Sequence, residues 1–403
     1  MDSAFSVTML YSINQIFWKA SQEDEFMNVE KVGTAIIGCG AVSDIYLKNL
    51  KEKFTIIRLI GCSDRNKWKR DEKAEKYGIR SMELSEVMED GDIQLVVNLT
   101  SPAGHYEISR LALENGKHVF SEKMMARSLQ EAEELCRIAS EKKLRLSAAP
   151  DTFLGDSLQT AAYILNHGLI GQPLSAVVSL SKDFRTYGDI LPHLNKVGGS
   201  LPYDSGCYYL TALAALFGPA KRVCAFAETH DPVHTVRRPD RAQFGETVTV
   251  EEENIAVGII TYENGVQASL HFNSEVRSSK DSQLSIYGTE GILRIEDPDR
   301  FDAPVFLQTA SGEVIRYPFT HGYTDNSRGI GAAETAWAIR GGRPQRAGME
   351  MAYHVLELLC RMTESARTGT VCKVESGFTL PAPLPSGFIS AGPMSPCEES
   401  ALI

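Results

Sequence analysis

The feature that most constrains the fold is an alternation of short aliphatic runs with longer segments of helical period, which extends from residue 32 to residue 149. Runs that are apolar throughout are typical of parallel strands, because helices cover such strands on both faces. We expect these strands at residues 34–38, 56–62, 95–100, 118–120 and 144–149. The clearest helix is expected at 128–143, where Ser128 can cap the first turn. The pattern predicts an α/β domain with a doubly wound parallel sheet.

The hydrophobic period changes to two after about residue 173, and turn dipeptides then separate the apolar runs. This change predicts a second domain of the α+β class with a large, open and mainly antiparallel sheet. Residues 254–272 predict a hairpin with Asn264 and Gly265 at its tip, because this dipeptide suits a two-residue turn. Further hairpins are expected at 284–296 and 305–319, and helices at about 204–217, 330–340 and 348–366.

A chain of 403 residues is too long for one compact domain, so we expect two. We divide the sequence into a first domain at residues 31–150 and a second domain at residues 151–380. Residues 1–30 are interpreted as an N-terminal extension that is no signal peptide, because they open with Asp2 and lack a basic leader. Residues 381–403 are interpreted as a Pro/Ser-rich tail.

Charge and composition argue against several classes of protein. The 41 basic and 52 acidic residues give a formal net charge of −11, which disfavours binding to nucleic acids and to anionic lipid surfaces. Basic residues occur in short groups mixed with acidic ones, as at 65–72, so we expect no nucleic-acid partner. No run approaches the ~20 apolar residues that a membrane span requires, so we expect no membrane association.

The eight cysteines are irregularly spaced and form no Cys-x-x-Cys pair. Such spacing favours reduced thiols and hence a cytoplasmic location. His230 and His234 flank Pro232, but no carboxylate or thiolate cluster joins them at the spacing of metal ligands. We therefore predict no metal site.

A glycine pair follows the first expected strand. Gly38 permits a tight turn, and Gly40 allows the backbone to approach a pyrophosphate, which the N–H groups at the start of the next helix can bind. Asp64 ends the second strand about 20 residues later and can accept hydrogen bonds from the adenosine ribose. This arrangement predicts a Rossmann domain that binds NAD. Arg65 could instead receive the 2′-phosphate of NADP, which is the less favoured cofactor.

Further motifs stand at the ends of later strands. Residues 100–105 read Thr-Ser-Pro-Ala-Gly-His, and residues 116–123 read Gly-Lys-His-Val-Phe-Ser-Glu-Lys. Residues 198–210 contain Gly-Gly-x4-Asp-x-Gly-x2-Tyr-Leu, and Gly-Thr-Glu-Gly occupies 288–291. With the Gly-Cys-Gly turn, these motifs resemble the glucose-fructose oxidoreductase, inositol dehydrogenase and rhizopine-catabolism (Gfo/Idh/MocA) family from residue 31 to about residue 366. The resemblance implies a dinucleotide-dependent enzyme that acts on a sugar, a polyol or a related compound.

The residues expected to contact the dinucleotide come from the glycine turn, the end of the second strand and the two later strand-end motifs. They are Gly38, Cys39, Gly40, Ala41, Val42, Asp64, Arg65, Thr100, Ser101, Pro102, His105, Glu122 and Lys123.

The resemblance implies that Lys123 acts at the reacting carbon. Hydride leaves a carbinol carbon only as the hydroxyl proton is removed, so a cation and a proton relay must lie beside that oxygen. We expect burial to lower the pKa of Lys123. The chain departs from the family pattern twice, because Met124 replaces a proline and Tyr208 stands where the family has a histidine.

Asp204 and Tyr208 are four residues apart on an expected helix, so both side chains can face one cleft. We expect Tyr208 to act with Lys123 as the acid/base pair if the lysine cation lowers the phenol pKa from its usual ~10, with Asp204 orienting the lysine or a substrate hydroxyl. Alternatively, Tyr208 stacks on a sugar ring, and His193 or His321 is the base. The expected substrate contacts are Asp151, Thr152, His193, Lys196, His321, Asn326 and Arg328.

Together these features predict a cytoplasmic NAD-dependent oxidoreductase with a sugar, glycoside or polyol substrate. Two alternatives stay open. One is an NAD-dependent enzyme that cleaves a glycoside through transient oxidation and elimination, and the other is a noncatalytic dinucleotide-binding regulatory protein. The open antiparallel sheet offers a face on which a second subunit can pack, so we expect a homo-oligomer.

Overall fold

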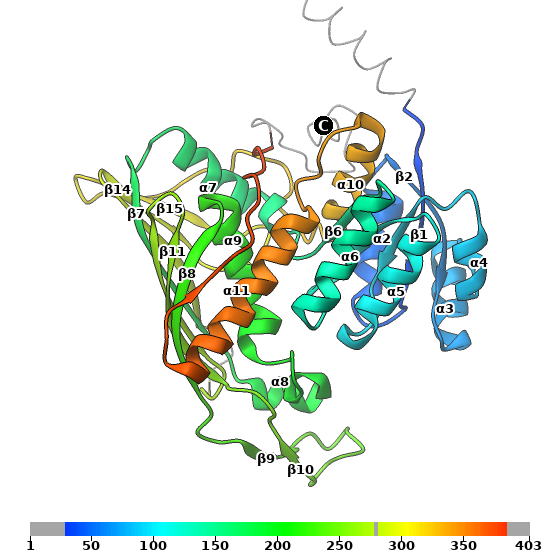
Figure 1. The fold of residues 1–403 in the computed structure, drawn as a ribbon, viewed down its shortest axis with the longest axis horizontal. Coiled ribbons are helices and arrows are strands. Elements are labelled where there is room, and N and C mark those ends of the chain that lie inside the picture. The colour runs from blue at the N-terminus through cyan, green and yellow to red at the C-terminus, as the bar shows by residue number, and fades with distance from the viewer. Residues whose placement is uncertain (1–28, 278–280, 385–403) are drawn as a thin grey trace, which may run out of the picture.

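The computed structural model describes residues 29–277 and 281–384, and Figure 1 shows two sheets side by side with helices between and around them. The first sheet has six parallel strands in the order β3-β2-β1-β4-β5-β6, which confirms the predicted doubly wound sheet. Its strands are β1 (Val32–Ile37), β2 (Ile57–Ser63), β3 (Arg80–Ser81), β4 (Leu95–Asn98), β5 (His118–Ser121) and β6 (Leu146–Ala148). The strand order reverses between β1 and β4, where ligands bind in folds of this kind.

Helices alternate with these strands. They are α2 (Ser43–Glu52), α3 (Lys67–Tyr77), α4 (Leu84–Glu89), α5 (Pro102–Glu114) and α6 (Leu129–Glu141). The predicted cap of α6 is confirmed, because the Ser128 hydroxyl accepts a hydrogen bond from the Glu131 backbone N–H at 3.2 Å. On the apolar stripe of α6, Ala132 and Leu135 are fully buried, whereas Leu129 and Cys136 are partly buried.

The second sheet has nine strands in the order β16-β15-β14-β13-β7-β12-β11-β8-β17. They are β7 (Pro173–Ser181), β8 (Ala220–Glu228), β11 (Ile255–Tyr262), β12 (Gln267–Asn273), β13 (Asp281–Gly288), β14 (Gly291–Ile295), β15 (Val305–Thr309), β16 (Val314–Arg316) and β17 (Cys372–Lys373). The three predicted hairpins are confirmed as β11–β12, β13–β14 and β15–β16. The sheet is mixed, because β12 runs parallel to β7.

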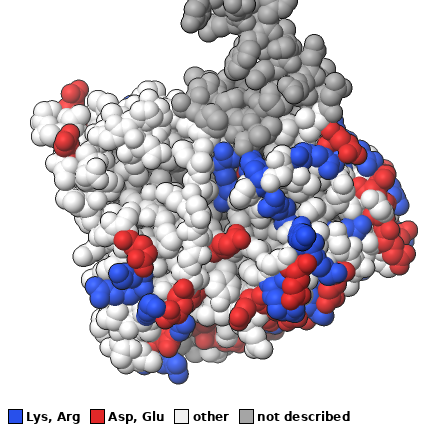
Figure 2. Space-filling model, turned by 45° about the horizontal axis from the view of Figure 1, so that its top comes forward, with Lys and Arg blue, Asp and Glu red and all other residues white. Residues whose placement is uncertain are grey.

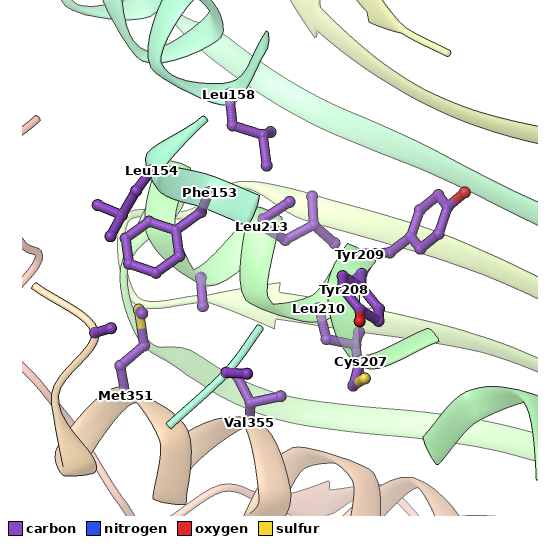
Figure 3. Close-up of a cluster of buried hydrophobic side chains, with 14 of the residues drawn as sticks. Phe153, Leu154, Leu158, Cys207, Tyr208, Tyr209, Leu210, Leu213, Met351 and Val355 are labelled. Atoms are coloured by element: carbon purple, nitrogen blue, oxygen red, sulfur yellow. The ribbon is translucent and has the colours of Figure 1, made fainter. Parts of the chain in front are cut away.

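Helices cover one face of this sheet. They are α7 (Asp156–Asn166), α9 (Cys207–Phe217) and α11 (Met349–Thr368). Figure 3 shows side chains from all three, among them Leu158, Leu213 and Val355, in one buried apolar cluster. The predicted helix at 204–217 begins with a π-helical turn, Pro202–Gly206, and continues as α9.

One helix and a pair of short strands lie beside this sheet. Helix α8 (Phe184–Ile190) follows β7, and the short strands β9 (Val233–Thr235) and β10 (Thr247–Thr249) pair with each other. Figure 1 shows β9 and β10 projecting beyond the second sheet on the side where α8 lies.

The last two helices pack on the first sheet, and α11 also contacts the second sheet. Helix α10 (Ile330–Gly341) packs against β5 and β6 of the first sheet, and α11 lies between α6 and β8. The α10 contact is close, since a Cβ on Gly331 would lie 2.5 Å from the ring of Phe120. The division of the sequence at residue 150 stays a prediction, as do the extension and the tail, which lie almost entirely outside the described residues.

The visible surface carries acidic and basic side chains close together, without an extended area of one sign (Figure 2). Within the described part of the chain, no helix is long and apolar enough to cross a membrane. All seven cysteines of that part are free thiols.

Candidate active site

The glycine turn lies between β1 and α2. Gly38 has a φ of +104°, and a Cβ there would lie 2.6 Å from the backbone of Leu99, so glycine is required. A Cβ on Gly40 would meet no heavy atom within 4 Å, although Gly40 lines two neighbouring cavities. The turn therefore leaves free space at the place where a pyrophosphate would approach the backbone. Ala41 and Val42 follow Gly40 along the cavity wall.

The first cavity, of about 620 Å³, lies at the carboxyl ends of β1, β2 and β4. Asp64 lines it and holds the turn, since its carboxylate accepts hydrogen bonds from the backbone N–H groups of Cys39 and Asn66, each at 2.8 Å. Arg65 and Lys69 also line this cavity. The size of this cavity, the carboxylate of Asp64 and the free space at the glycine turn fit the adenosine and pyrophosphate parts of a dinucleotide.

The second cavity, of about 520 Å³, lies where the two parts of the fold meet. It shares with the first cavity the walls formed by Gly40, Leu99, Thr100 and Ser101. Of the predicted residues, the second cavity also brings together Pro102, His105, Glu122, Lys123, His193, Asp204, Tyr208 and Arg328. The two cavities therefore adjoin each other along their shared walls.

Lys123 and Asp204 form an ion pair in the second cavity. The Lys123 ammonium donates to the Asp204 carboxylate at 2.8 Å and to the Asp204 carbonyl at 2.6 Å. Burial opposes the lysine charge, but Asp204 and its neighbours outweigh this effect and raise the pKa of Lys123 well above its ordinary value. The expectation of a lowered lysine pKa was therefore wrong, because the sequence could not show how closely the carboxylate approaches. Lys123 in turn lowers the pKa of Asp204, although burial opposes this shift.

Tyr208 lies beside this pair. Its ring centre is 5.4 Å from the Lys123 ammonium, and the Arg328 guanidinium lies 5.9 Å from the same ring. Burial raises the pKa of the Tyr208 phenol, and the opposing effect of Lys123 is smaller. The expectation of a lowered phenol pKa was also wrong, because desolvation of the ring outweighs the nearby cation.

Arg328 is held by two polar partners. It donates to the Asp299 carboxylate at 2.8 Å and to the Asn326 side chain at 2.9 Å. The Asn49 side chain of α2 donates to the backbone carbonyls of Asn326 and Arg328. Asn326 thus positions Arg328 and does not itself line either cavity.

The two remaining candidates near the cavity differ in position. His193 lines the second cavity from a position that is partly open to solvent, and partial desolvation lowers the pKa of its imidazole from the ordinary value. Lys196 lies on the surface, where its ammonium pairs with Glu251 at 2.6 Å, and it does not line the cavity.

Three further predicted substrate contacts lie outside both cavities, as Lys196 and Asn326 do. The buried carboxylate of Asp151 accepts hydrogen bonds from Gly329 and Gly331 at the start of α10, and Thr152 is buried beside it. The ring of His321 is also buried and contacts the backbone carbonyl of Leu384 at 2.9 Å. The structure gives these residues packing and capping roles in place of the expected substrate contacts.

His105 and Glu122 hold the backbone of the site. The ring nitrogens of the buried His105 lie 2.7 Å from the Met124 carbonyl and 2.9 Å from the Thr100 carbonyl, so the ring connects the loops after β4 and β5. Glu122 accepts hydrogen bonds from the Tyr46 hydroxyl at 2.7 Å and from the Lys123 backbone N–H.

Sequence reasoning missed several residues of the second cavity. The notable ones are Arg127, Leu191 and Val197. No motif or spacing marks them, because they come from connecting segments that only the packing of the two sheets brings together. Among the described residues, no group of three or more His, Cys, Asp or Glu side chains could hold a metal ion.

The doubly wound sheet, the glycine turn and the joined cavities define a two-domain dinucleotide-binding oxidoreductase. Residues 32–149 match the family model described as "Oxidoreductase family, NAD-binding Rossmann fold", and residues 158–294 match the GFO/IDH/MocA C-terminal domain. The chain belongs to the Gfo/Idh/MocA family, and its first domain is an NAD-binding Rossmann domain.

Several known proteins resemble this chain. D-glucoside 3-dehydrogenase of Escherichia coli (strain K12) is 26% identical over 363 residues, which cover 85% of this chain and 98% of that protein. An uncharacterised oxidoreductase of Synechocystis sp. is 26% identical over 214 residues, which cover 52% of this chain and 56% of that protein. The chain thus spans about half the length of the first curated relatives it matches. Levoglucosan dehydrogenase in complex with NADH and L-sorbose shares the fold, with a TM-score of 0.74, 19% identity, and coverage of 86% of this chain and 99% of that one.

Proposed function

We propose that the protein is an NAD-dependent dehydrogenase that acts on a carbinol carbon of a neutral sugar, glycoside or polyol. The observation that carries the proposal is the Lys123–Asp204 ion pair, which lines a cavity that shares wall residues with the dinucleotide cavity. A fixed cation at this place can stabilise the oxygen of a carbinol as its proton leaves. The family membership and the likeness to D-glucoside 3-dehydrogenase support this activity.

The charges around the second cavity favour a neutral substrate. Lys123 pairs with Asp204, Arg328 pairs with Asp299, and Arg127 at the rim lies 3.6 Å from Glu131. Each of these cations is balanced by a carboxylate, so none is left to neutralise a substrate carboxylate or phosphate. The same groups can exchange hydrogen bonds with several hydroxyls, as a sugar or polyol requires.

The pKa shifts suggest which groups move the proton. NAD, when bound, supplies the hydride acceptor or donor. Lys123 stays charged because its pKa is raised, so it donates a hydrogen bond to the substrate oxygen but is a poor base. His193 is neutral because its pKa is lowered, and it can accept the hydroxyl proton. Tyr208 stays protonated and donates a hydrogen bond or stacks on the sugar ring.

NAD is favoured over NADP by Asp64, whose carboxylate lines the first cavity and would repel a 2′-phosphate. Arg65 and Lys69 line the same cavity and could bind that phosphate, so NADP stays the alternative. One relative, scyllo-inositol 2-dehydrogenase (NADP(+)) of Bacillus subtilis, is 28% identical.

We further propose a cytoplasmic location, which suits the free thiols, and a homo-oligomer that forms through the second sheet.

The test is a screen of sugars, inositols and glycosides for NADH formation by the wild type and Lys123→Met. We expect the variant to lose on the order of 10³-fold in kcat and to keep its NAD affinity, because the lysine acts on the reacting oxygen. Release of an aglycone without net NADH would select the elimination mechanism. Absence of turnover in both proteins, with nucleotide retained in mass spectra, would select the noncatalytic role.

A further inference from the structure

Two apolar side chains stand at the mouth of the active-site cavity. Leu191 and Val197 line the same cavity as Lys123 and Asp204, yet 39% of Leu191 and 71% of Val197 are exposed. Both belong to the segment of residues 191–199, here called the loop, which follows α8 and contains the 3-10 turn Pro192–Asn195. Exposed apolar surface of this kind gains free energy when a ligand covers it.

The backbone of this loop is tightly organised. The N–H of Leu194 donates to the Leu191 carbonyl at 3.0 Å, that of Lys196 to the His193 carbonyl at 3.1 Å, and that of Gly199 to the Lys196 carbonyl at 2.8 Å. A Cβ on Gly199 would lie 2.1 Å from the His193 carbonyl oxygen, so these two parts of the loop approach too closely for a larger residue. The exposure of the two apolar side chains therefore follows from an ordered backbone.

The segment that carries β9 and β10 braces the loop from outside. Lys196 pairs with Glu251, and the Glu251 backbone N–H donates to the Asn195 carbonyl at 3.0 Å. On the same side, the Arg237 backbone N–H donates to the buried carboxylate of Asp189 in α8 at 2.8 Å. These contacts hold the loop in place without covering its apolar side chains.

We propose that Leu191 and Val197 form a subsite for an apolar aglycone, so that the preferred substrates are aryl or alkyl glycosides. This inference rests on the proposed dehydrogenase function. The polar groups of the cavity, Lys123 and Asp204, bind the sugar ring, while the apolar pair contacts the group attached to it. His193 lies between Leu191 and Val197 in the sequence and lines the same cavity, so the loop offers both a proton acceptor and an apolar surface.

The experiment compares methyl and phenyl β-glycosides of glucose, galactose and xylose. The rate of NADH formation yields kcat/KM for each member of a pair with the wild type and with the Leu191→Asn/Val197→Thr variant. We expect the wild type to favour the phenyl member roughly tenfold, since covering a few carbon atoms has an effect of this size. The variant should lose most of this preference, because its kcat/KM should fall further for the phenyl glycosides than for the methyl glycosides. Val233→Thr, at an exposed valine of β9 that does not line the cavity, is the matched control.

The possible results distinguish a failure of the proposed subsite from a failure of the proposed dehydrogenase function. The subsite proposal is overturned if the phenyl preference is equal in the wild type and the double variant, or if the wild type has no such preference. In either case, NADH formation leaves the proposed dehydrogenase function intact. Absence of NADH with every sugar, inositol and glycoside overturns the dehydrogenase function and the subsite with it. An altered oligomeric state of the double variant with unchanged selectivity shows that the loop contacts a second copy, which also overturns the subsite.

Discussion

The charge of each residue at the active site depends on its immediate neighbours. Lys123 and Tyr208 are both partly or fully buried, yet the lysine gains an ion pair and the phenol does not. The lysine therefore stays charged and the phenol stays neutral, whereas the sequence suggested a lysine and a tyrosine that share a proton. This difference transfers the role of proton acceptor to His193 in the proposed mechanism.

A change at Gly40 tests the dinucleotide site at the scale of one residue. A Cβ at this position meets no protein atom, so Gly40→Ala should change the free energy of unfolding by less than about 1 kcal/mol. The same methyl group projects into the space that the dinucleotide needs, so the Kd for NAD should rise roughly tenfold or more. Urea unfolding and a fluorescence titration with NAD measure the two quantities.

Gly91→Ala is the matched control, because a Cβ there is equally free of contacts and Gly91 lies outside both cavities. It should leave the unfolding and the NAD titration unchanged. An unaltered Kd in Gly40→Ala would contradict the placement of the pyrophosphate at this turn.

At the scale of elements, Asp151 caps the start of helix α10, although we predicted that it contacts the substrate. The buried carboxylate of Asp151 accepts the first N–H groups of α10 from Gly329 and Gly331. Burial raises the pKa of Asp151 to about 6, although these N–H groups and Arg328 act in the opposite direction. Ionisation of the Asp151 carboxyl therefore costs more free energy in the folded state than in the unfolded chain.

This cost makes stability depend on pH. The unfolded carboxyl has a pKa of ~3.9, so between pH 4 and pH 6 the folded state binds more protons, and the free energy of unfolding falls as pH rises. The share of Asp151 in this fall is about 3 kcal/mol. Asp151→Asn keeps a side-chain oxygen for the cap but does not ionise, so the slope of stability against pH should become shallower in this range. Urea unfolding at several pH values measures the slope.

Asp240→Asn provides the control for this prediction. The carboxylate of Asp240 is exposed, and its hydrogen bond with Arg238 lowers its pKa to about 2, outside the range in question. The slope between pH 4 and pH 6 should therefore match the wild type. An unchanged slope in Asp151→Asn would show that this carboxyl titrates normally. Burial raises the pKa of Asp156 to about 6 as well, so part of the slope should survive in every variant.

At the scale of the whole molecule, one face of the second sheet carries apolar side chains that none of the described helices covers. Phe226 on β8 and Val257 on β11 stand directly opposite each other and are 68% and 45% exposed. Ile259 and Val177 extend the exposed apolar surface across neighbouring strands. Such a surface favours association with a second copy of the chain.

Phe226→Glu tests this association. We expect the wild type to show a mass above the 44.3 kDa of one chain in light scattering, and the variant to shift toward one chain, because a charge would be buried at the interface. Phe244→Glu changes a phenylalanine that is 57% exposed outside the strands, and it should leave the mass unchanged. A wild type that is monomeric at micromolar concentration would contradict the proposal.

Most of the fold could be predicted because its signals are local. The five long strands of the first sheet, the Ser128 cap and the three hairpins all follow from patterns within about 20 residues. The parallel pairing of β12 with β7 was missed, since it joins strands that lie about 90 residues apart. Helix α10 was predicted at its place in the sequence, but its contact with Phe120 has no signal in the sequence.

Local sequence determined the glycine turn, the strand-end Lys123 and the helical spacing of Asp204 and Tyr208, because each depends on the geometry of a few neighbouring residues. Tertiary structure decided which of the candidate residues meet. It brought His193 and Arg328 to the cavity and turned Asp151 and His321 into the interior. It also set the protonation of Lys123 and Tyr208, since burial and the approach of opposite charges arise only when distant segments pack together.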